Sequence, residues 1–169
     1  GQAMDQGTDV DYAVVDVGLQ PCEPALELVA SSTAARPFDL IRLTPSGGTG
    51  RWTFALTENL SGGSVNETTG VYLAGEIMGV QDTVVLTDAG CLGQATVTLE
   101  IVAPMRVIPE APEVSPGEAL RFEVEGGSGD VEFSLLNDSA SSIDDDGRYV
   151  AGAESGWELI QIVDRATGQ

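Results

Sequence analysis

The sequence contains no histidine and no lysine, so the side chains that most often act as general bases or form Schiff bases are missing. Serines are plentiful, but no activating partner for any of them is evident in the sequence. We therefore predict that the protein is not an enzyme. Long apolar runs are missing as well, and with none near 18 residues we expect no membrane-spanning segment.

Basic residues are scarce. Seven arginines stand against 27 acidic residues, and the formal net charge is −20. Such a charge repels phosphate backbones, which argues against nucleic acid as a partner. One interpretation is a soluble, non-sticky surface; another is Ca²⁺ binding, because clustered carboxylates suit a hard divalent cation. An initiator methionine and a signal peptide are also missing, as expected of a mature form or a fragment.

The sequence does contain an internal repeat. Gly47–Leu56 recurs as Gly126–Leu135, and Gly70–Gly75 recurs as Gly147–Gly152. The register between the copies holds over most of the chain, which indicates a duplicated structural module of about 75–79 residues. With 5% aromatic residues and abundant Gly, Ser, Thr and Val, each module is expected to consist of short strands joined by turns.

Comparing the two copies separates buried from exposed positions, because alternate residues of a strand point to opposite faces. Apolar residues recur at every second position, and we predict that five of them form the core of the first copy: Trp52, Phe54, Tyr72, Val84 and Leu86. Between them, Val85 is replaced by Gln161 in the second copy, which places this position on the solvated face. One buried and one solvated face is typical of antiparallel sheets packed as a sandwich. No segment has a sustained helical period, so almost no helix is expected.

Glycine-rich loops precede the Phe-containing strand in both copies. Without a following helix pattern or a lysine, they favour a tight turn over a phosphate-binding loop. The order Gly-Gly-(Ser/Thr)-Gly-x-x-x-Phe-x-Leu, then Gly-x-Tyr-x-Ala-Gly, then an apolar strand ending in Asp before a Gly hairpin resembles bacterial immunoglobulin-like repeats. The resemblance covers Leu26–Gln169. Such repeats occur in tandem in secreted proteins, surface lipoproteins and adhesins of Gram-negative bacteria, where they serve as spacers, stalks and binding heads.

The resemblance implies an exported bacterial protein, extracellular or at the cell surface, with a structural or adhesive role. A specific glycan-, protein- or Ca²⁺-binding module is the alternative. In an immunoglobulin-type sandwich the start of the first strand and the last hairpin lie at the same end, so Cys22 and Cys91 are expected to form a disulfide. Two unrelated free thiols remain the other possibility. A disulfide would place the protein outside a reducing cytosol.

The chain begins and ends out of phase with its repeat. Residues Tyr12–Leu19 align with Gln94–Ile101, the last strand of the first copy, whereas the second copy stops before that strand. We therefore predict an all-β chain of two tandem immunoglobulin-like β-sandwiches, the second lacking its own last strand, plus an extra N-terminal β-strand. The expected boundaries are residues 1–21 for the N-terminal hairpin remnant and strand, 22–102 for the first sandwich and 103–169 for the second.

Two explanations of this phase stay open. The chain is a piece of a longer tandem array, in which neighbouring repeats are the partners, or identical subunits complement one another head-to-tail by strand donation into filaments. In the second case the inward residues of the donor strand are Ala13, Val15, Val17 and Leu19, and the acceptor groove contains Phe133, Ile160 and Ile162.

Metal candidates are two groups of aspartates in predicted turns. They are Asp144, Asp145 and Asp146 before a strand of the second copy, and Asp5, Asp9 and Asp11 near the N-terminus. Neither group has the spacing of an EF-hand loop. Aspartates in turns also bond their own backbone. We expect no cofactor other than Ca²⁺ at these positions.

Overall fold

The structure is a computed structural model that describes residues 18–137 and 140–169. Strands, turns and loops make up these residues, and they include no helix long and apolar enough to cross a membrane. The predicted all-β class is confirmed. In chain order the strands are β1 (Glu27–Ala30), β2 (Ala34–Ala35), β3 (Leu40–Ser46), β4 (Trp52–Asn59), β5 (Ser64–Val65), β6 (Val71–Leu73), β7 (Val80–Asp88), β8 (Gln94–Ile101), β9 (Arg106–Ile108), β10 (Ala119–Arg121), β11 (Glu123–Glu125), β12 (Val131–Leu135), β13 (Ser142–Ile143), β14 (Arg148–Val150) and β15 (Ile160–Asp164).

The first module, strands β1 to β8, is a sandwich of two four-stranded sheets. One sheet has the order β1-β3-β6-β5 and the other β2-β8-β7-β4. All of these pairs are antiparallel except β2 with β8, which is parallel. This arrangement, with the first strand divided between both sheets, is that of an immunoglobulin-like fold.

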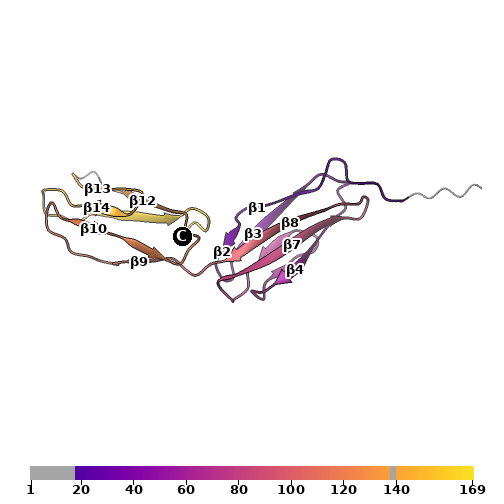
Figure 1. The fold of residues 1–169 in the computed structure, drawn as a ribbon, viewed down its shortest axis with the longest axis horizontal. Helices are drawn as coiled ribbons and strands as arrows, with labels where there is room; N and C mark the ends of the chain where they lie inside the picture. The colour runs from indigo at the N-terminus through magenta and orange to yellow at the C-terminus, as the bar shows by residue number, and fades with distance from the viewer. Residues whose placement is uncertain (1–17, 138–139) are drawn as a thin grey trace, which may run out of the picture.

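The second module, strands β9 to β15, follows the first end to end (Figure 1). Its first sheet is divided into a two-stranded part, β9–β11, and a three-stranded part, β10–β14–β13. Its second sheet consists of β12 and β15. These pairings reproduce those of β1, β3, β6 and β5 and of β4 and β7. Within the described residues of this module, no strand corresponds to β8.

The core of the first module lies between its two sheets. Phe54, Tyr72, Val84 and Leu86 are at most 2% exposed, as predicted from the alternation. Trp52 is half-buried against the same core, and its indole Nε1 donates a hydrogen bond to the carbonyl of Gly47 at 3.1 Å.

The prediction that Val85 of β7 lies on a solvated face is wrong in one respect: the residue is buried, with 8% exposure. Its strand lies in the middle of the sheet, so Ala55 of β4 and Thr96 of β8 flank this residue on either side. Gln161, at the same position of β15, is exposed. Alternation predicts which face a residue occupies, but neighbouring strands also shield residues on the outer face.

A phenylalanine packs against a glycine in the same way in both modules. At Gly70 an added Cβ would lie 2.7 Å from Cζ of Phe54, and at Gly147 it would lie 2.9 Å from Cζ of Phe133. Both glycines also have positive φ, +66° and +75°, a conformation that other residues rarely adopt. Glycine is therefore required at this turn for two reasons: the backbone has positive φ, and a side chain would collide with the phenylalanine ring.

Candidate functional site

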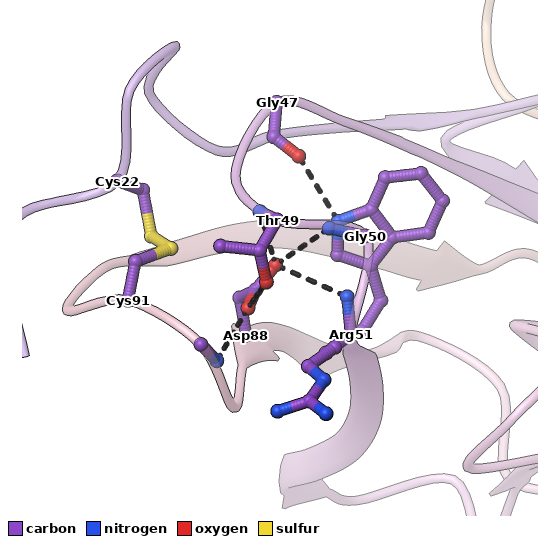
Figure 2. The surroundings of a disulfide bond; sticks show 9 residues. Cys22, Gly47, Thr49, Gly50, Arg51, Asp88 and Cys91 are labelled. Atoms are coloured by element: carbon purple, nitrogen blue, oxygen red, sulfur yellow. Dashed lines mark hydrogen bonds between the residues drawn. A yellow bond between two sulfur atoms is a disulfide. The ribbon is translucent and has the colours of Figure 1, made fainter.

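The outer end of the first module is closed by a disulfide. Cys22 and Cys91 are bonded, with their Cα atoms 5.0 Å apart, so the predicted pairing is confirmed (Figure 2). Next to it, Pro21 pairs with Leu92 of the β7–β8 hairpin. The bond thus joins the incoming chain to the hairpin that ends the sandwich.

Asp88, beside the disulfide, organises the glycine-rich loop (Figure 2). Its carboxylate accepts hydrogen bonds from the hydroxyl of Thr49 at 2.5 Å and from the amides of Thr49, Gly50 and Gly90 at 2.8, 3.0 and 2.7 Å. Burial favours the neutral acid. The donors, chiefly the Thr49 hydroxyl and the Gly90 amide, outweigh that effect and lower the pKa of Asp88 to about 2. The carboxylate therefore acts as an anchor for the loop.

The second module repeats this anchor with Asp164. Its carboxylate accepts from the Ser128 hydroxyl at 2.7 Å and from the amides of Ala166 and Thr167 at 3.0 and 3.1 Å. Burial again opposes ionisation, but the hydrogen bonds lower the pKa of Asp164 below its ordinary value. Sequence analysis did not assign this role, although the recurrence of the aspartate in both copies was a usable signal.

A second polar cluster surrounds the shared tyrosine. Tyr72 donates to the carboxylate of Asp82 at 2.6 Å, and the Ser61 hydroxyl donates to the same carboxylate at 2.5 Å. Burial and the hydrogen bond to Asp82 raise the pKa of Tyr72, so the phenol stays neutral. In the second module Tyr149 donates in the same way to Glu158, which Ser141 also contacts. In each module the carboxylate is held by these donors, fully buried at Asp82 and half-buried at Glu158, an arrangement that supports packing better than catalysis.

The predicted metal ligands of the second module lie in a turn. The carboxylate of Asp144 accepts hydrogen bonds from the amides of Asp146 and Arg148, at 3.1 and 2.8 Å. Nowhere in residues 18–137 and 140–169 do three or more acidic or cysteine side chains gather in a way that could hold a metal ion. The structure thus uses Asp144 as a turn cap and does not bring Asp144, Asp145 and Asp146 into one cluster. Asp5, Asp9 and Asp11 lie outside the described residues.

The edge of β15 is the candidate site that bears on assembly. In the first module β7 pairs with β4 on one side and β8 on the other, whereas β15 pairs with β12 alone among the described strands. The predicted groove residues lie on this strand pair: Phe133 pairs with Ile162, and Ile160, two positions along β15, pairs with Leu135. Of the inward residues of the predicted donor strand, Ala13, Val15 and Val17 lie outside the described residues. Leu19 lies within them, and its side chain is 50% exposed.

Burial at this edge differs sharply between the two modules. Phe54, Val84 and Leu86 are at most 2% exposed beneath their neighbouring strands. Their counterparts Phe133, Ile160 and Ile162 are only half-buried. The fully buried cluster of the first module includes Leu99 and Ile101 of β8, the strand without a counterpart here.

Two further features mark the second module as open. A cleft of about 400 Å³ reaches Phe133 from the side of β11, next to Val131, which takes the position of Trp52 in the first module. Trp157, just before β15, is fully exposed at 100%. A fully exposed indole, three residues before a strand that pairs on one side only among the described strands, is an unusual place for a large apolar ring.

No protein-family model matches the sequence, and no curated protein matches it. Among solved structures, the chain is similar to the C-terminal 282-residue fragment of intimin, crystallised with the intimin-binding domain of the translocated intimin receptor. The identity is 16% and the TM-score 0.54, over 83% of this chain and 60% of that one. The chain therefore spans less than two thirds of that fragment.

Two cadherin structures match more distantly. Human protocadherin-24 EC1-2 has a TM-score of 0.36 at 14% identity, over 76% of this chain and 77% of that one. Drosophila N-cadherin EC1-4 has a TM-score of 0.31 at 14% identity, over 85% and 44%. At these identities the intimin likeness establishes the immunoglobulin-like fold alone.

Proposed function

We propose that this chain is a non-catalytic structural and adhesive segment of an exported bacterial surface protein, and that its modules join head-to-tail by β-strand donation. The contrast between β7, paired on both sides, and β15, paired with β12 alone among the described strands, carries the proposal. The disulfide fits an oxidising compartment. The similar intimin fragment was crystallised with a receptor domain, which supports an adhesive role for the fold.

The donor is the segment Tyr12–Leu19 of a neighbouring copy. Its apolar residues alternate as those of β8 do, and an added strand would extend the hydrogen-bond ladder beyond β15. The same strand would cover Ile160 and Ile162, which stay half-buried without it. Both the backbone and the side chains of the edge therefore favour a strand as the ligand.

The register of the first module predicts one specific contact. There Gln81 of β7 pairs with Glu100 of β8. The repeat aligns Gln81 with Trp157 and Glu100 with Gly18, so the donated strand would place Gly18 opposite the exposed indole. An aromatic ring that covers a cross-strand glycine is a stabilising pair in sheets.

Donation within one molecule conflicts with the arrangement of the modules. The described chain enters the first module at the end away from the second (Figure 1). Four linker residues, 20–23, span only about 14 Å. A neighbouring copy is therefore the donor, and because such a head-to-tail contact does not close on itself it builds filaments.

The test compares two adjacent valines by mass photometry and light scattering over a range of protein concentrations. The wild-type chain is expected to form oligomers of increasing length. Val15→Asp places a charge on the inward face, where burial without a partner is costly, and should leave the protein monomeric. Val14→Asp adds the same charge on the outward face of the same strand and should assemble like the wild type.

A peptide with the sequence of Tyr12–Leu19 separates the donor from the acceptor. The monomeric Val15→Asp chain retains its β15 edge and should bind this peptide, but not the peptide with the same substitution. A wild-type chain that stays monomeric at high concentration and ignores the peptide would contradict donation. The covering strand would then belong to a longer tandem array, the alternative stated above.

A further inference from the structure

Phe38 has a backbone conformation that is rare for a bulky residue. It lies in the turn between β2 and β3 with φ at +69°, in the left-handed region. Its ring is 67% exposed, so core packing does not explain why a phenylalanine stands there. Strained backbone positions with exposed side chains cluster at binding sites.

The second module makes the same turn with a glycine. Gly117 occupies the position of Phe38, with φ at +80°. Phe38 donates its amide to the carbonyl of Ala74, directly after β6, at 3.1 Å, and Gly117 donates to the carbonyl of Ala151, directly after β14, at 3.2 Å. The turn therefore works with glycine, and the phenylalanine adds nothing that the fold requires.

Other exposed apolar side chains surround Phe38. Leu40 and Leu73 are cross-strand partners on β3 and β6, with exposures of 69% and 38%. Phe38, Leu73 and Ile77 line one cleft of about 230 Å³. We call these four residues, Phe38, Leu40, Leu73 and Ile77, the Phe38 patch.

Three glycines, Gly62, Gly63 and Gly75, are among the residues that line the cleft. An added Cβ at Gly75 would overlap the carbonyl of Ser61, and one at Gly63 would lie 2.7 Å from the carbonyl of Leu73. The volume of the cleft is below the roughly 300–1,000 Å³ of small-molecule sites. A space of this size, lined by glycines and by apolar side chains, fits a single large side chain of a protein.

The charges around the patch indicate the character of that protein. Glu76 is the charged residue among those that line the cleft. Arg36, on the same turn as Phe38, is already paired with Asp39 at 3.0 Å. Because Arg36 is neutralised by Asp39, the charge at the cleft is the negative one of Glu76, of the same sign as the net charge of −20 of the whole chain, and both favour a basic partner.

We propose that the Phe38 patch binds a basic segment of another protein, which inserts one large apolar side chain into the cleft while its lysines or arginines face the acidic surface. An aromatic ring at the centre of such a contact is the residue type that most often dominates the binding energy. The interaction is independent of strand donation, because the patch and the β15 edge lie on different modules.

The probe is a phage-displayed library of random 12-residue peptides, selected on the immobilised full chain. Enriched peptides are expected to combine one aromatic or large aliphatic residue with several basic ones. Their synthetic versions should bind less tightly as salt rises, because the charges are screened. Affinities are measured by fluorescence polarisation.

Phe38→Gly is the decisive variant, since it copies the turn of the second module. It should fold with a thermal midpoint within a few degrees of the wild type and weaken peptide binding at least about tenfold. Ile77→Ser, on the rim of the cleft, should weaken binding as well. Val29→Ser removes an exposed apolar side chain on β1, outside the patch, and should leave the affinity unchanged.

Three results would overturn the proposal. The first is a selection that enriches no peptide, or only peptides without basic residues. The second is equal binding to the wild type and to Phe38→Gly. The third is self-association of the wild type that Phe38→Gly abolishes, which would identify a second copy of this chain as the occupant.

Discussion

Replacement of Phe54 by alanine tests how far the two modules differ in packing. The ring of Phe54 is 2% exposed and packs against Gly70. It belongs to a sheet in which β7 pairs with a strand on each side. Removing a fully buried phenylalanine costs about 3–5 kcal/mol, from lost burial and from the cavity that remains. We expect Phe54→Ala to lower the stability of the first module by this amount.

Phe133→Ala is the matched control in the second module. Phe133 packs against Gly147 as Phe54 packs against Gly70, but it is half-buried and reaches an open cleft. The ring already keeps part of its contact with water, so we expect a loss of only about 1–3 kcal/mol. The difference between the two substitutions measures what the additional strand contributes.

Urea denaturation measures both losses. Trp52 is half-buried in the first module and Trp157 is exposed in the second, so fluorescence in a Trp157→Phe background follows the first module. Circular dichroism follows the whole chain. For m-values of about 1–3 kcal/mol/M, Phe54→Ala should lower the first midpoint by at least about 1 M urea.

An unchanged midpoint for Phe54→Ala would refute the strand register. Equal losses at Phe54 and Phe133 would refute the structural contrast between the modules, and would mean that the inner face of β12 is covered in solution. A larger loss at Phe133 in a concentrated, assembled sample than in a dilute one would point to covering by a neighbouring copy.

Three further predictions concern the polar contacts and the disulfide. Cys22→Ser with Cys91→Ser opens a loop of 69 residues and should cost about 4 kcal/mol, and thiol titration of the unreduced, denatured wild type should find no free sulfhydryl. Because the pKa of Asp88 falls from 3.8 to about 2 on folding, its contribution is complete above pH 3.8 and is lost as the pH falls to 2. Thermal midpoints of the first module should therefore decrease over that interval, and less steeply in Asp88→Asn. Tyr72→Phe removes a donor from the buried carboxylate of Asp82 and should cost about 1.5–3 kcal/mol in urea denaturation, whereas a change below 0.5 kcal/mol would count against a charge-assisted bond.

Much of the fold follows from local patterns in the sequence. The repeat predicted two similar modules, and alternation placed Phe54, Val84 and Leu86 on the buried face, where the structure has them. Glycine-rich loops predicted tight turns, and the structure has positive φ there at Gly47 and Gly126, +79° and +74°. The predictions of buried faces and of tight turns succeed because strand periodicity and turn conformation depend on residues close together in the chain.

Other features depend on which segments meet in space. Asp88 and Thr49 are 39 residues apart, and only the packing of the hairpin against the loop brings the carboxylate to its donors. Val85 is buried because β4 and β8 flank it, which no alternation pattern expresses. Asp144 caps a turn, although a run of three aspartates in the sequence also made it a candidate metal ligand.

The sequence by itself determined the duplication, most of the strand faces and the turns, because each is carried by residue type and spacing within one copy or by comparison of two. Only the tertiary structure decided that Phe38 and Gly117 share one turn conformation, with the ring left in solvent. The physical reason is that exposure and partner choice depend on the path of the whole chain. A local pattern constrains the direction in which a side chain points, whereas the surrounding strands determine what covers it.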